Sequence, residues 1–329
     1  MQRLESIWYD DHPLGYCLAP AAWLFAAGVV LRRRLYQTRV IPATRLPVPV
    51  IVIGNITVGG TGKTPLVVWA AELLSQRGYR PGIVSRGYLG RAKQWPQQVR
   101  ADSDPIMVGD EPVMLARRTE CPVVAAGPER AAAAAALMRH SGCDVVLSDD
   151  GLQHLALARD IEIAVVDGER RFGNGRCLPA GPLREPVARL KSVDFVVVNG
   201  ESSVAGIPMR LEMGAPTSLR DPGRQTTFST FQHAPVHAVC GIGNPTRFFR
   251  QLESKGLNII PHRYPDHHAF QPKDLEFDDA CPLLMTEKDA VKCARFASDR
   301  MWYVPVNAVL PSTFTAEFLQ TLQRLAKAR

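Results

Sequence analysis

Short apolar segments alternate with amphipathic or alanine-rich segments along the first 200 residues. The runs that we interpret as buried strands span residues 46–53, 81–85, 122–125, 144–148, 161–166 and 195–198. Helix-like stretches at 63–77 and 129–140 lie between them. Strands that alternate with helices predict an α/β fold, in which helices cover both faces of a largely parallel sheet.

The pattern changes beyond about residue 200, where a polar stretch punctuated by Pro and Gly covers 201–232. A second α/β set follows, with strands at 236–240, 282–285 and 302–306 and helices at 246–255 and 314–327. We therefore expect three parts. They are an N-terminal segment, 1–35; a core, 36–205; and a smaller C-terminal α/β domain, 206–329, that closes over the active site.

The N-terminal segment contains an 18-residue run without charge, residues 14–31, which ends at three arginines, 32–34. Acidic residues precede the run, whereas a secretory signal carries positive charge there. Pro, Gly and Ala make the run weakly apolar, although it is just long enough to span a bilayer. The pattern favours a helix in the headgroup region whose arginines meet anionic lipid, with a spanning helix and an ordinary buried helix as alternatives.

Composition adds little that is specific. The chain has 329 residues, of which 46% are hydrophobic and 22% are charged, which is typical of globular proteins. Its seven cysteines form no C-x-x-C pair and have no His at zinc-ligand spacing, so we expect neither disulfides nor a structural metal. The net charge of +7 is spread along the chain and indicates solubility rather than a nucleic-acid partner.

A glycine-rich loop joins the first predicted strand to the first predicted helix. It comprises Thr57, Val58, Gly59, Gly60, Thr61, Gly62, Lys63 and Thr64. The glycines allow backbone N–H groups to surround phosphate oxygens, and the helix directs its positive N-terminus at the same anion. Lys63 would then contact the β- and γ-phosphates, and Thr64 would offer its hydroxyl to Mg²⁺. The loop predicts a P-loop fold that binds a nucleoside triphosphate.

Two departures narrow the class of P-loop protein. Thr57 replaces the usual first glycine, and Val58 stands where partition-type ATPases carry a lysine. GTPases read guanine with N-K-x-D after a late strand, and the nearest approximation, residues 286–289, does not match this motif. We therefore expect ATP as the nucleotide.

Turnover also requires carboxylates for the metal. Asp149 and Asp150 end an apolar strand, which would deliver them beside the phosphate loop, and Gln153 and His154 follow at once. Asp110 lies in a Gly-Asp-Glu-Pro turn, where by chemistry alone it is more simply the start of a helix. His267 becomes a stronger candidate for a functional residue if the two domains close on each other, because it could then share a proton with an Asp from the other domain. The stretches containing Arg86, Arg171 and Asn174 could bind phosphates or carry solvated charge.

In combination these motifs resemble the tetraacyldisaccharide 4′-kinase family, whose members are associated with the inner membrane of Gram-negative bacteria. The motifs that carry the resemblance are Gly54-Asn55 with GGTGKTP, then SRGY, GDEP, DDGLQH, RFGNG with LPAGPLREP, Asp266-His267 and TEKD. They occur in this order from about residue 46 to 293, so the resemblance covers most of the chain.

The resemblance implies transfer of the γ-phosphoryl group of ATP to the 4′-hydroxyl of an acylated glucosamine disaccharide 1-phosphate, the precursor of lipid A. It implies that Lys63 and Thr64 hold phosphates and Mg²⁺, that Asp149 and Asp150 serve the metal, and that Asp110 is the base oriented by His267. Candidate substrate-binding residues are Asn55, Arg86, Gln153, His154, Arg171 and Asn174. The enzyme is expected at the cytoplasmic face of the inner membrane, peripheral or N-terminally anchored, against its anionic surface.

Two other functions compete with this one. A P-loop switch or partition-type ATPase at the membrane would produce a conformational change, but Val58 and the lack of N-K-x-D disfavour it. A non-enzymatic membrane adaptor could use nucleotide as a structural ligand, although it would not need the paired Asp149 and Asp150.

Overall fold

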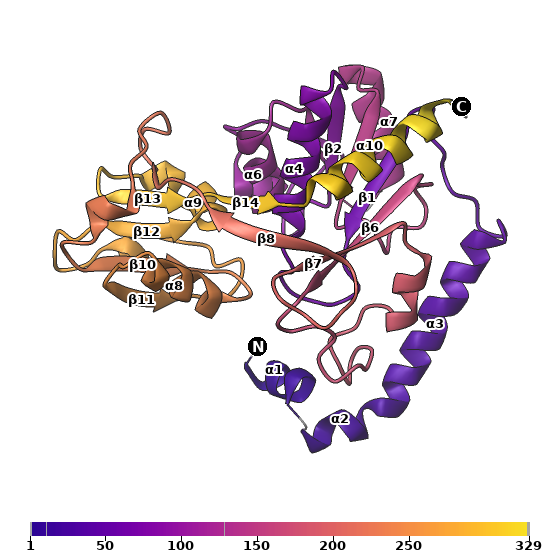
Figure 1. Ribbon diagram of the computed structural model, residues 1–329, viewed down its shortest axis with the longest axis horizontal. Helices are drawn as coiled ribbons and strands as arrows, with labels where there is room; N and C mark the ends of the chain where they lie inside the picture. Colours follow the sequence, from indigo (N-terminus) through magenta and orange to yellow (C-terminus); the bar gives the residue numbers. More distant parts are fainter. Residues whose placement is uncertain (1, 11, 128, 328–329) are drawn as a thin grey trace.

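A computed structural model describes residues 2–10, 12–127 and 129–327. Met1, Asp11, Pro128 and the last two residues, which the three expected parts include, lie outside these ranges. The described chain forms two sheets in two lobes, one of nine strands and one of five (Figure 1). Helices cover both faces of the larger sheet, and the longest N-terminal helix, α3 (Ala19–Gln37), runs along the outside of this lobe.

The larger sheet has the strand order β14-β8-β7-β6-β1-β5-β2-β4-β3. Its strands are β1 (Val50–Gly54), β2 (Pro81–Ser85), β3 (Gln97–Val99), β4 (Val123–Ala125), β5 (Val145–Asp149), β6 (Ile161–Asp167), β7 (Phe195–Asn199), β8 (Ile207–Met213) and β14 (Val306–Val309). The pairings are parallel except at the two edges, where β3 and β14 pair antiparallel. The central strands are buried on both faces, which explains their largely apolar sequences, although Glu162 lies within β6 and Ser148 within β5.

Alternate residues of β1 face opposite layers of helices. Ile51 and Ile53 join the core with α4 (Lys63–Gln76), α6 (Asp110–Arg118) and α10 (Ser312–Lys327). Val50 and Val52 join the core with α7 (Arg130–Ser141) on the other face. A short helix, α5 (Pro105–Val108), precedes α6. The four 3-10 turns of the described chain are η1 (Val187–Ser192), η2 (Phe228–Phe231), η3 (Pro272–Leu275) and η4 (Ala294–Phe296).

The smaller sheet has the order β11-β10-β12-β13-β9, with only β9 antiparallel to its neighbour. Its strands are β9 (Thr217–Ser218), β10 (Val236–Cys240), β11 (Ile259–Arg263), β12 (Leu283–Thr286) and β13 (Met301–Val304). Two helices follow strands of this sheet, α8 (Pro245–Ser254) after β10 and α9 (Glu287–Cys293) after β12. The carboxyl ends of these strands therefore place the starts of α8 and α9 along one edge.

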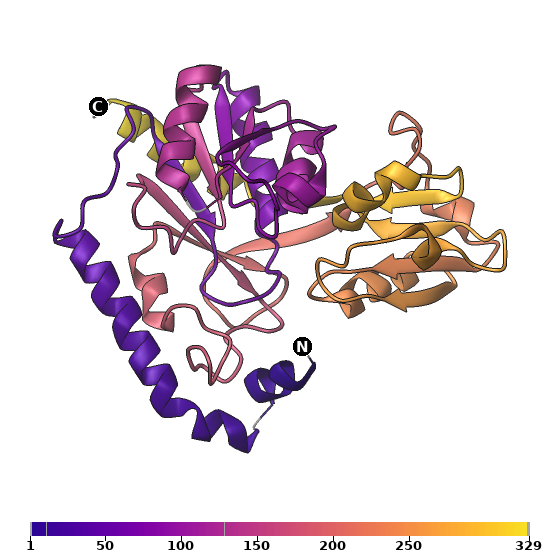
Figure 2. The ribbon, with the colours of Figure 1, turned by 180° about the vertical axis from the view of Figure 1, so that it is seen from behind.

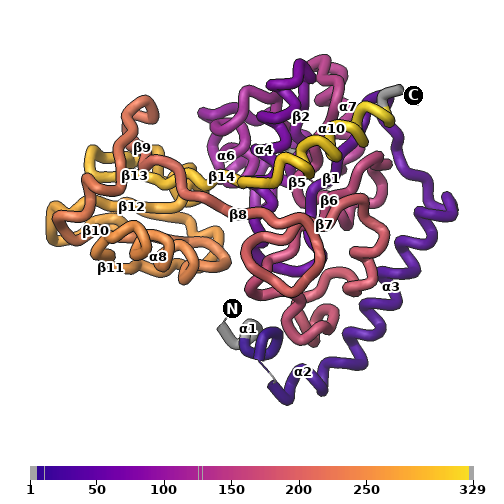
Figure 3. Tube along the Cα trace, in the orientation of Figure 1, coloured from indigo at the N-terminus to yellow at the C-terminus, as the bar shows by residue number. Residues whose placement is uncertain are grey.

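The chain passes between the lobes twice, along the antiparallel pair of β8 and β14 (Figure 3). The expected single strand at 302–306 is therefore two strands of different sheets, divided at Pro305, which has no N–H to continue the ladder. The final helix, α10, returns to the larger lobe. There Phe314 stacks on Trp69, with 5.5 Å between the centroids of the two rings. The expected domain boundary at residue 205 therefore does not coincide with the boundary between the lobes, because β8, β14 and α10 follow residue 205 in the sequence but belong to the larger lobe.

The N-terminal segment forms three helices, α1 (Gln2–Tyr9), α2 (Pro13–Cys17) and α3 (Ala19–Gln37). Figure 2 shows α3 along the outside of the larger lobe, while α1 lies toward the opening between the lobes. Trp23 and Leu24 are 71% and 77% exposed on α3. Within the described residues, none of the helices has both the length and the apolarity that crossing a membrane requires.

Candidate active site

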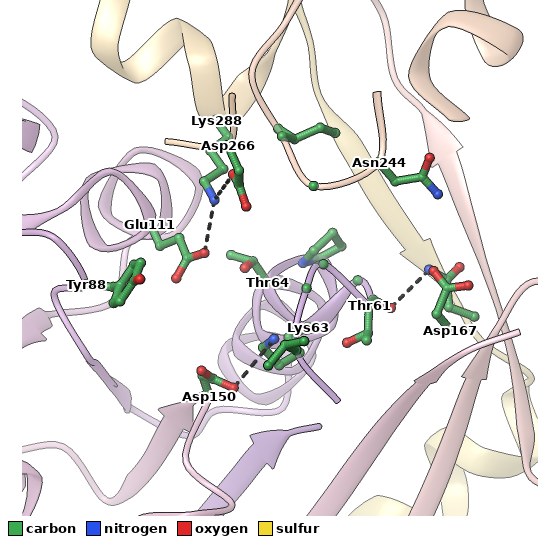
Figure 4. A pocket seen from close by; sticks show the side chains of 18 of the residues that line it. Thr61, Lys63, Thr64, Tyr88, Glu111, Asp150, Asp167, Asn244, Asp266 and Lys288 are labelled. Carbon is green, nitrogen blue, oxygen red and sulfur yellow. Dashed lines mark hydrogen bonds and ion pairs between the residues drawn. The ribbon is translucent and has the colours of Figure 1, made fainter. Parts of the chain in front are cut away.

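A cavity of about 890 Å³ lies between the two lobes and is lined by residues of both. The larger lobe contributes the glycine-rich loop, the start of α6 and the ends of β5, β6 and β7. The smaller lobe contributes the turns that start α8 and α9 and the loop that follows β11 (Figure 4). Trp8 and Tyr9 of α1 also line the cavity. It therefore lies at the carboxyl ends of strands from two sheets, where parallel α/β proteins bind ligands.

The glycine-rich loop depends on backbone conformations that side chains disfavour. Gly59 and Gly62 have φ of +98° and +92°. A Cβ at Gly62 would lie 2.8 Å from Asn199 Nδ2, and that same nitrogen donates to the Thr61 carbonyl at 3.1 Å. Glycine is thus required both by conformation and by the close approach of β7. The loop leads directly into α4, whose N-terminus faces the cavity.

Asp150 is the acid nearest to the loop lysine. Its carboxylate lies 3.5 Å from Lys63 Nζ and accepts two hydrogen bonds from Arg184, at 3.0 and 3.1 Å. Burial alone would raise the pKa of Asp150, but the charges of Lys63 and Arg184 outweigh it and lower the pKa below its ordinary range. Asp150 also has φ of +49°, an uncommon conformation for a residue with a side chain, and such conformations cluster at functional sites.

Asp149 differs from its neighbour, because it is buried without a cation in contact. Ser85 Oγ donates to Oδ2 at 3.5 Å, and Oδ1 has no hydrogen-bond partner in the described part of the chain. Burial, with repulsion from Glu111 and Asp150, raises the pKa of Asp149 to about 7. A buried carboxylate oxygen without a partner, next to a second carboxylate, suits a divalent cation that prefers oxygen ligands.

The two lobes meet at Asp110 and His267. Asp110 begins α6, after Gly109 with φ of +94°, so its position at a helix start agrees with the simpler interpretation of the sequence. It also accepts a hydrogen bond from His267 Nδ1 at 3.0 Å, across 157 positions of sequence. Burial would raise the pKa of Asp110, but the His267 hydrogen bond and the Lys288 charge lower it to about 2. Asp110 is therefore an ionised carboxylate at neutral pH.

Lys288 lies beside this pair and was not among the residues to which the sequence assigned a role. Its Nζ lies 3.3 Å from Asp266 Oδ1 and 3.4 Å from Glu111 Oε1 (Figure 4). It also lies 3.2 Å from His267 Nε2. Burial opposes its charge, but the carboxylates of Glu111, Asp110 and Asp266 outweigh burial and raise its pKa. An ammonium group thus connects the start of α6 to the smaller lobe.

The candidate substrate-binding residues fall into two groups. Arg86, Gln153 and His154 line the cavity. Burial, together with the charges of Arg130 and Arg86, lowers the pKa of His154 to about 3, so its imidazole is neutral at physiological pH. Gln153 Nε2 donates to the Asn55 carbonyl at 3.0 Å and to Glu185 Oε1 at 2.8 Å. Gln153 is therefore held by its own partners at the edge of the cavity.

The other three candidates, Asn55, Arg171 and Asn174, are not among the residues that line the cavity. Asn55 is fully buried, and its Nδ2 faces Thr57 Oγ1 and the Gly59 carbonyl at 3.5 and 3.4 Å. Asn174 donates to the Ile7 and Ala180 carbonyls, which fixes α1 to the larger lobe. Arg171 is exposed outside the cavity.

Several cavity residues lie at strand ends that the sequence analysis identified without assigning them roles. Asp167 ends β6, Asn199 ends β7, and Arg170 follows β6. Arg170 donates to the Gly243 carbonyl at 3.1 Å, and Arg247 of α8 donates to Asn199 Oδ1 at 3.0 Å. The rule that ligands bind at the carboxyl ends of parallel strands could have indicated these positions.

Comparison with known proteins agrees with this architecture. The family model described as tetraacyldisaccharide-1-P 4′-kinase (LpxK) matches residues 14–323. A tetraacyldisaccharide 4′-kinase of Nitrosococcus oceani is 54% identical over 98% of this chain and 95% of its own length. The corresponding proteins of Alkalilimnicola ehrlichii and Coxiella burnetii are 51% and 45% identical, each over 99% of this chain and 98% and 97% of their own lengths.

A solved structure extends the comparison to the fold. The crystal structure of LpxK from Aquifex aeolicus in complex with ATP has a TM-score of 0.79 and 25% identity, and the match covers 94% of this chain and 99% of that one. The predicted P-loop α/β architecture is confirmed by this likeness and by the parallel order of the sheets. From its sequence and its fold, this chain belongs to the tetraacyldisaccharide-1-phosphate 4′-kinase family.

Proposed function

We propose that this chain transfers the γ-phosphoryl group of ATP to the 4′-hydroxyl of the acylated glucosamine disaccharide 1-phosphate from which lipid A is made. Family membership supports this activity. The observation that carries it is that one cavity is lined by both the P-loop lysine, Lys63, and His267, whose Nδ1 donates to the buried carboxylate of Asp110 at 3.0 Å. A nucleotide cradle and an ionised carboxylate that can face an acceptor hydroxyl are the two parts that such a kinase needs.

The glycine-rich loop is proposed to hold the triphosphate. Its backbone N–H groups and the N-terminus of α4 attract anions, and Lys63 and Arg184 add positive charge on the same side. In this structure both cations contact Asp150. Phosphoryl transfer is promoted mainly by position and charge neutralisation, which is what this arrangement of groups supplies.

Thr64, Asp149 and Asp150 are proposed to hold Mg²⁺, which when bound would neutralise charge on the β- and γ-phosphates. The unpartnered Oδ1 of Asp149 fits such an ion. Among the described residues, no group of three or more His, Cys, Asp or Glu side chains is arranged to hold a metal. Mg²⁺ commonly takes one or two carboxylates and completes its shell with water and substrate phosphates, so two aspartates are sufficient.

Asp110 is proposed as the base that faces the sugar hydroxyl, with His267 as its orienting partner. The hydrogen bond from Nδ1 leaves one Asp110 oxygen, Oδ2, fixed against the imidazole, while Oδ1 accepts from the Glu111 N–H at 2.9 Å. A carboxylate of low pKa is a weak base, and its contribution is mainly to orient the hydroxyl and accept its proton late in the transfer.

Incubation with γ-³²P-labelled ATP and the lipid disaccharide tests this function. We expect label in the lipid and no transfer to a disaccharide that already carries a 4′-phosphate. Label that appears only in inorganic phosphate, at the same rate with and without lipid, would contradict the kinase and favour the switch ATPase.

We further propose that α3 contacts the anionic inner-membrane surface, which would bring the cavity to an acylated substrate. Trp23, Leu24 and Leu31 are exposed on this helix, and the arginines at 32–34 end the apolar run. Arg32 donates to the Gln153 carbonyl at 3.2 Å, and Arg33 donates to Ser192 at 2.6 Å. The helix is therefore attached to the core through its basic end, while its apolar side chains stay exposed.

Substitution of Trp23 and Leu24 by glutamate should weaken binding to anionic vesicles by roughly tenfold or more, because two large apolar side chains no longer enter the bilayer. Transfer to lipid in vesicles should fall in parallel, whereas transfer to detergent-dispersed lipid should stay near that of the wild type. The measurements are vesicle sedimentation and label transfer. Ile260→Glu, which changes a partly exposed apolar residue of the smaller lobe, is the matched control.

These substitutions test the membrane contact more cleanly than removal of residues 1–34, because Trp8, Tyr9 and Arg32 line the cavity itself. Truncation would therefore remove part of the cavity wall as well as the apolar surface. Unchanged vesicle binding by the double variant would refute the proposed contact.

A further inference from the structure

The contacts around His267 limit the protonation states that this imidazole can adopt. A lysine ammonium group donates hydrogen bonds and accepts none, and an ionised carboxylate accepts and does not donate. His267 Nε2 lies 3.2 Å from Lys288 Nζ, and Nδ1 lies 3.0 Å from Asp110 Oδ2. Both contacts are hydrogen bonds only if Nε2 is without a proton and Nδ1 carries one.

We propose that Lys288 is a positioning residue of the transfer reaction, which holds His267 in the neutral Nδ1–H tautomer, so that the Asp110 carboxylate is hydrogen-bonded to a neutral imidazole and not paired with an imidazolium. The inference rests on the proposed function, and it assigns to Lys288 no contact with substrate. The proposal gives a reason for the third contact of this buried ammonium group. The carboxylates of Asp266 and Glu111 are sufficient to balance its charge, yet its Nζ also contacts His267.

The position of Lys288 is itself well fixed. It lies in the first turn of α9, which follows β12 directly and is capped by Thr286, whose side chain accepts from the Asp289 N–H. Asp289 is fully buried and also accepts from the Gly241 N–H at 2.9 Å, so the start of α9 is tied to the end of β10. The ammonium group is therefore carried on a rigid part of the smaller lobe.

Every charged or titratable group that faces His267 bears on its protonation. In contact with it are Asp110 from α6, Tyr88 from the loop after β2, Asp266 from the same loop and Lys288 from α9, while Glu111 of α6 contacts Lys288 and the charge of Lys292 acts on Asp110. Burial lowers the pKa of His267, the Asp110 hydrogen bond raises it, and the Lys288 charge lowers it, with a net rise. Protonation of Nε2 would remove the acceptor that faces Lys288 Nζ, and Lys288 is the cation in contact that opposes it.

Loss of the Lys288 charge should therefore raise the pKa of His267. The expected rise is about one pH unit, since a unit charge at about 3 Å contributes this much even when solvent screens it as strongly as bulk water. His267 would then be doubly protonated over more of the neutral range. An imidazolium that already pairs with Asp110 stabilises the carboxylate and makes it a poorer acceptor for the hydroxyl proton.

Histidine NMR on the full chain, without ATP or lipid, tests the proposal directly. His267→Gln identifies the resonances of His267 in protein that carries ¹⁵N-labelled histidine. In the wild type we expect the Nδ1–H tautomer. In Lys288→Met we expect a pKa about one unit higher, whereas Lys288→Arg, which keeps a donor and a charge, should stay close to the wild type. Lys255→Met, an exposed lysine of the same lobe, is the control.

The pH dependence of kcat for label transfer supplies the second measurement. The acid limb should move upward by the same shift in Lys288→Met, with about tenfold lower kcat at pH 6 and recovery toward pH 8.5. If Lys288 only held the lobes together, its substitution would lower kcat by the same factor at every pH. An Nε2–H tautomer in the wild type, or an unchanged His267 pKa in Lys288→Met, would overturn the proposal. Failure of the wild type to phosphorylate lipid would refute the function and leave the NMR result to decide on Lys288.

Discussion

Lys63→Ala should lower phosphoryl transfer by roughly 10³-fold or more in kcat/KM. The ammonium group is the cation that follows the glycine-rich loop and faces the cavity, and alanine leaves the triphosphate without it. Arg184 would remain paired with Asp150 and would still balance the charge of this carboxylate, so the variant should fold normally. Label transfer from γ-³²P-ATP to the lipid gives the rate, and circular dichroism reports the fold.

Lys191→Ala is the matched control for this variant. Lys191 is exposed in η1 and lies outside the cavity, so its loss removes the same charge without touching the site. It should transfer label at the wild-type rate. A Lys63→Ala protein that kept more than about a tenth of wild-type kcat/KM would show that the loop does not hold the reacting phosphates.

Asp110→Asn should lower kcat by roughly 10²- to 10⁴-fold while the KM for ATP changes by less than about twofold. The amide keeps the size of the carboxylate, and its oxygen can still accept from His267 Nδ1, but it cannot take the proton of the sugar hydroxyl. The pKa of Asp110 is about 2, so the carboxylate is ionised throughout the range where the enzyme would be assayed. The defect of the variant should therefore persist at every pH from 5 to 9.

Asp102→Asn supplies the comparison, because Asp102 is an exposed carboxylate of the same lobe whose Oδ1 lies 3.4 Å from Nε of exposed Arg100. Its kcat should equal that of the wild type. If Asp110→Asn kept full kcat, the assignment of Asp110 as base would be wrong. If it raised the KM for ATP as much as it lowered kcat, Asp110 would act in nucleotide binding instead.

The parts of the fold that the sequence predicts well are those with a strong local signal. The strand β1 and the helix α4 flank a glycine-rich loop, and β5 and β6 are largely apolar because both of their faces are covered. β8 was not predicted, since it lies in a polar stretch and buries few of its side chains. β14 was merged with β13, because hydropathy does not show that Pro305 divides two sheets.

The same difference between local and distant signals applies to the site. A motif identifies Lys63 and places Asp150 near it, since both follow neighbouring parallel strands. The contact of Asp110 with His267 depends on how two lobes pack across 157 positions, for which spacing carries no information. Asn174 was expected to bind substrate because it lies in a polar motif. Its side chain instead donates hydrogen bonds to two backbone carbonyls, which a sequence does not reveal.

The two strands that join the lobes, β8 and β14, make the smaller lobe an insertion in the P-loop unit. The chain leaves and returns at neighbouring points, where the Gly214 N–H donates to the Pro305 carbonyl at 2.8 Å. A gene in which codon 214 was fused to codon 305 would encode a protein that keeps the nucleotide loop and Asp110 but lacks His267 and Lys288. Calorimetry should find that it still binds ATP. The segment of chain that orients Asp110 would then be separable from the segment that holds the phosphates, and a designed enzyme could exchange the first without changing the second.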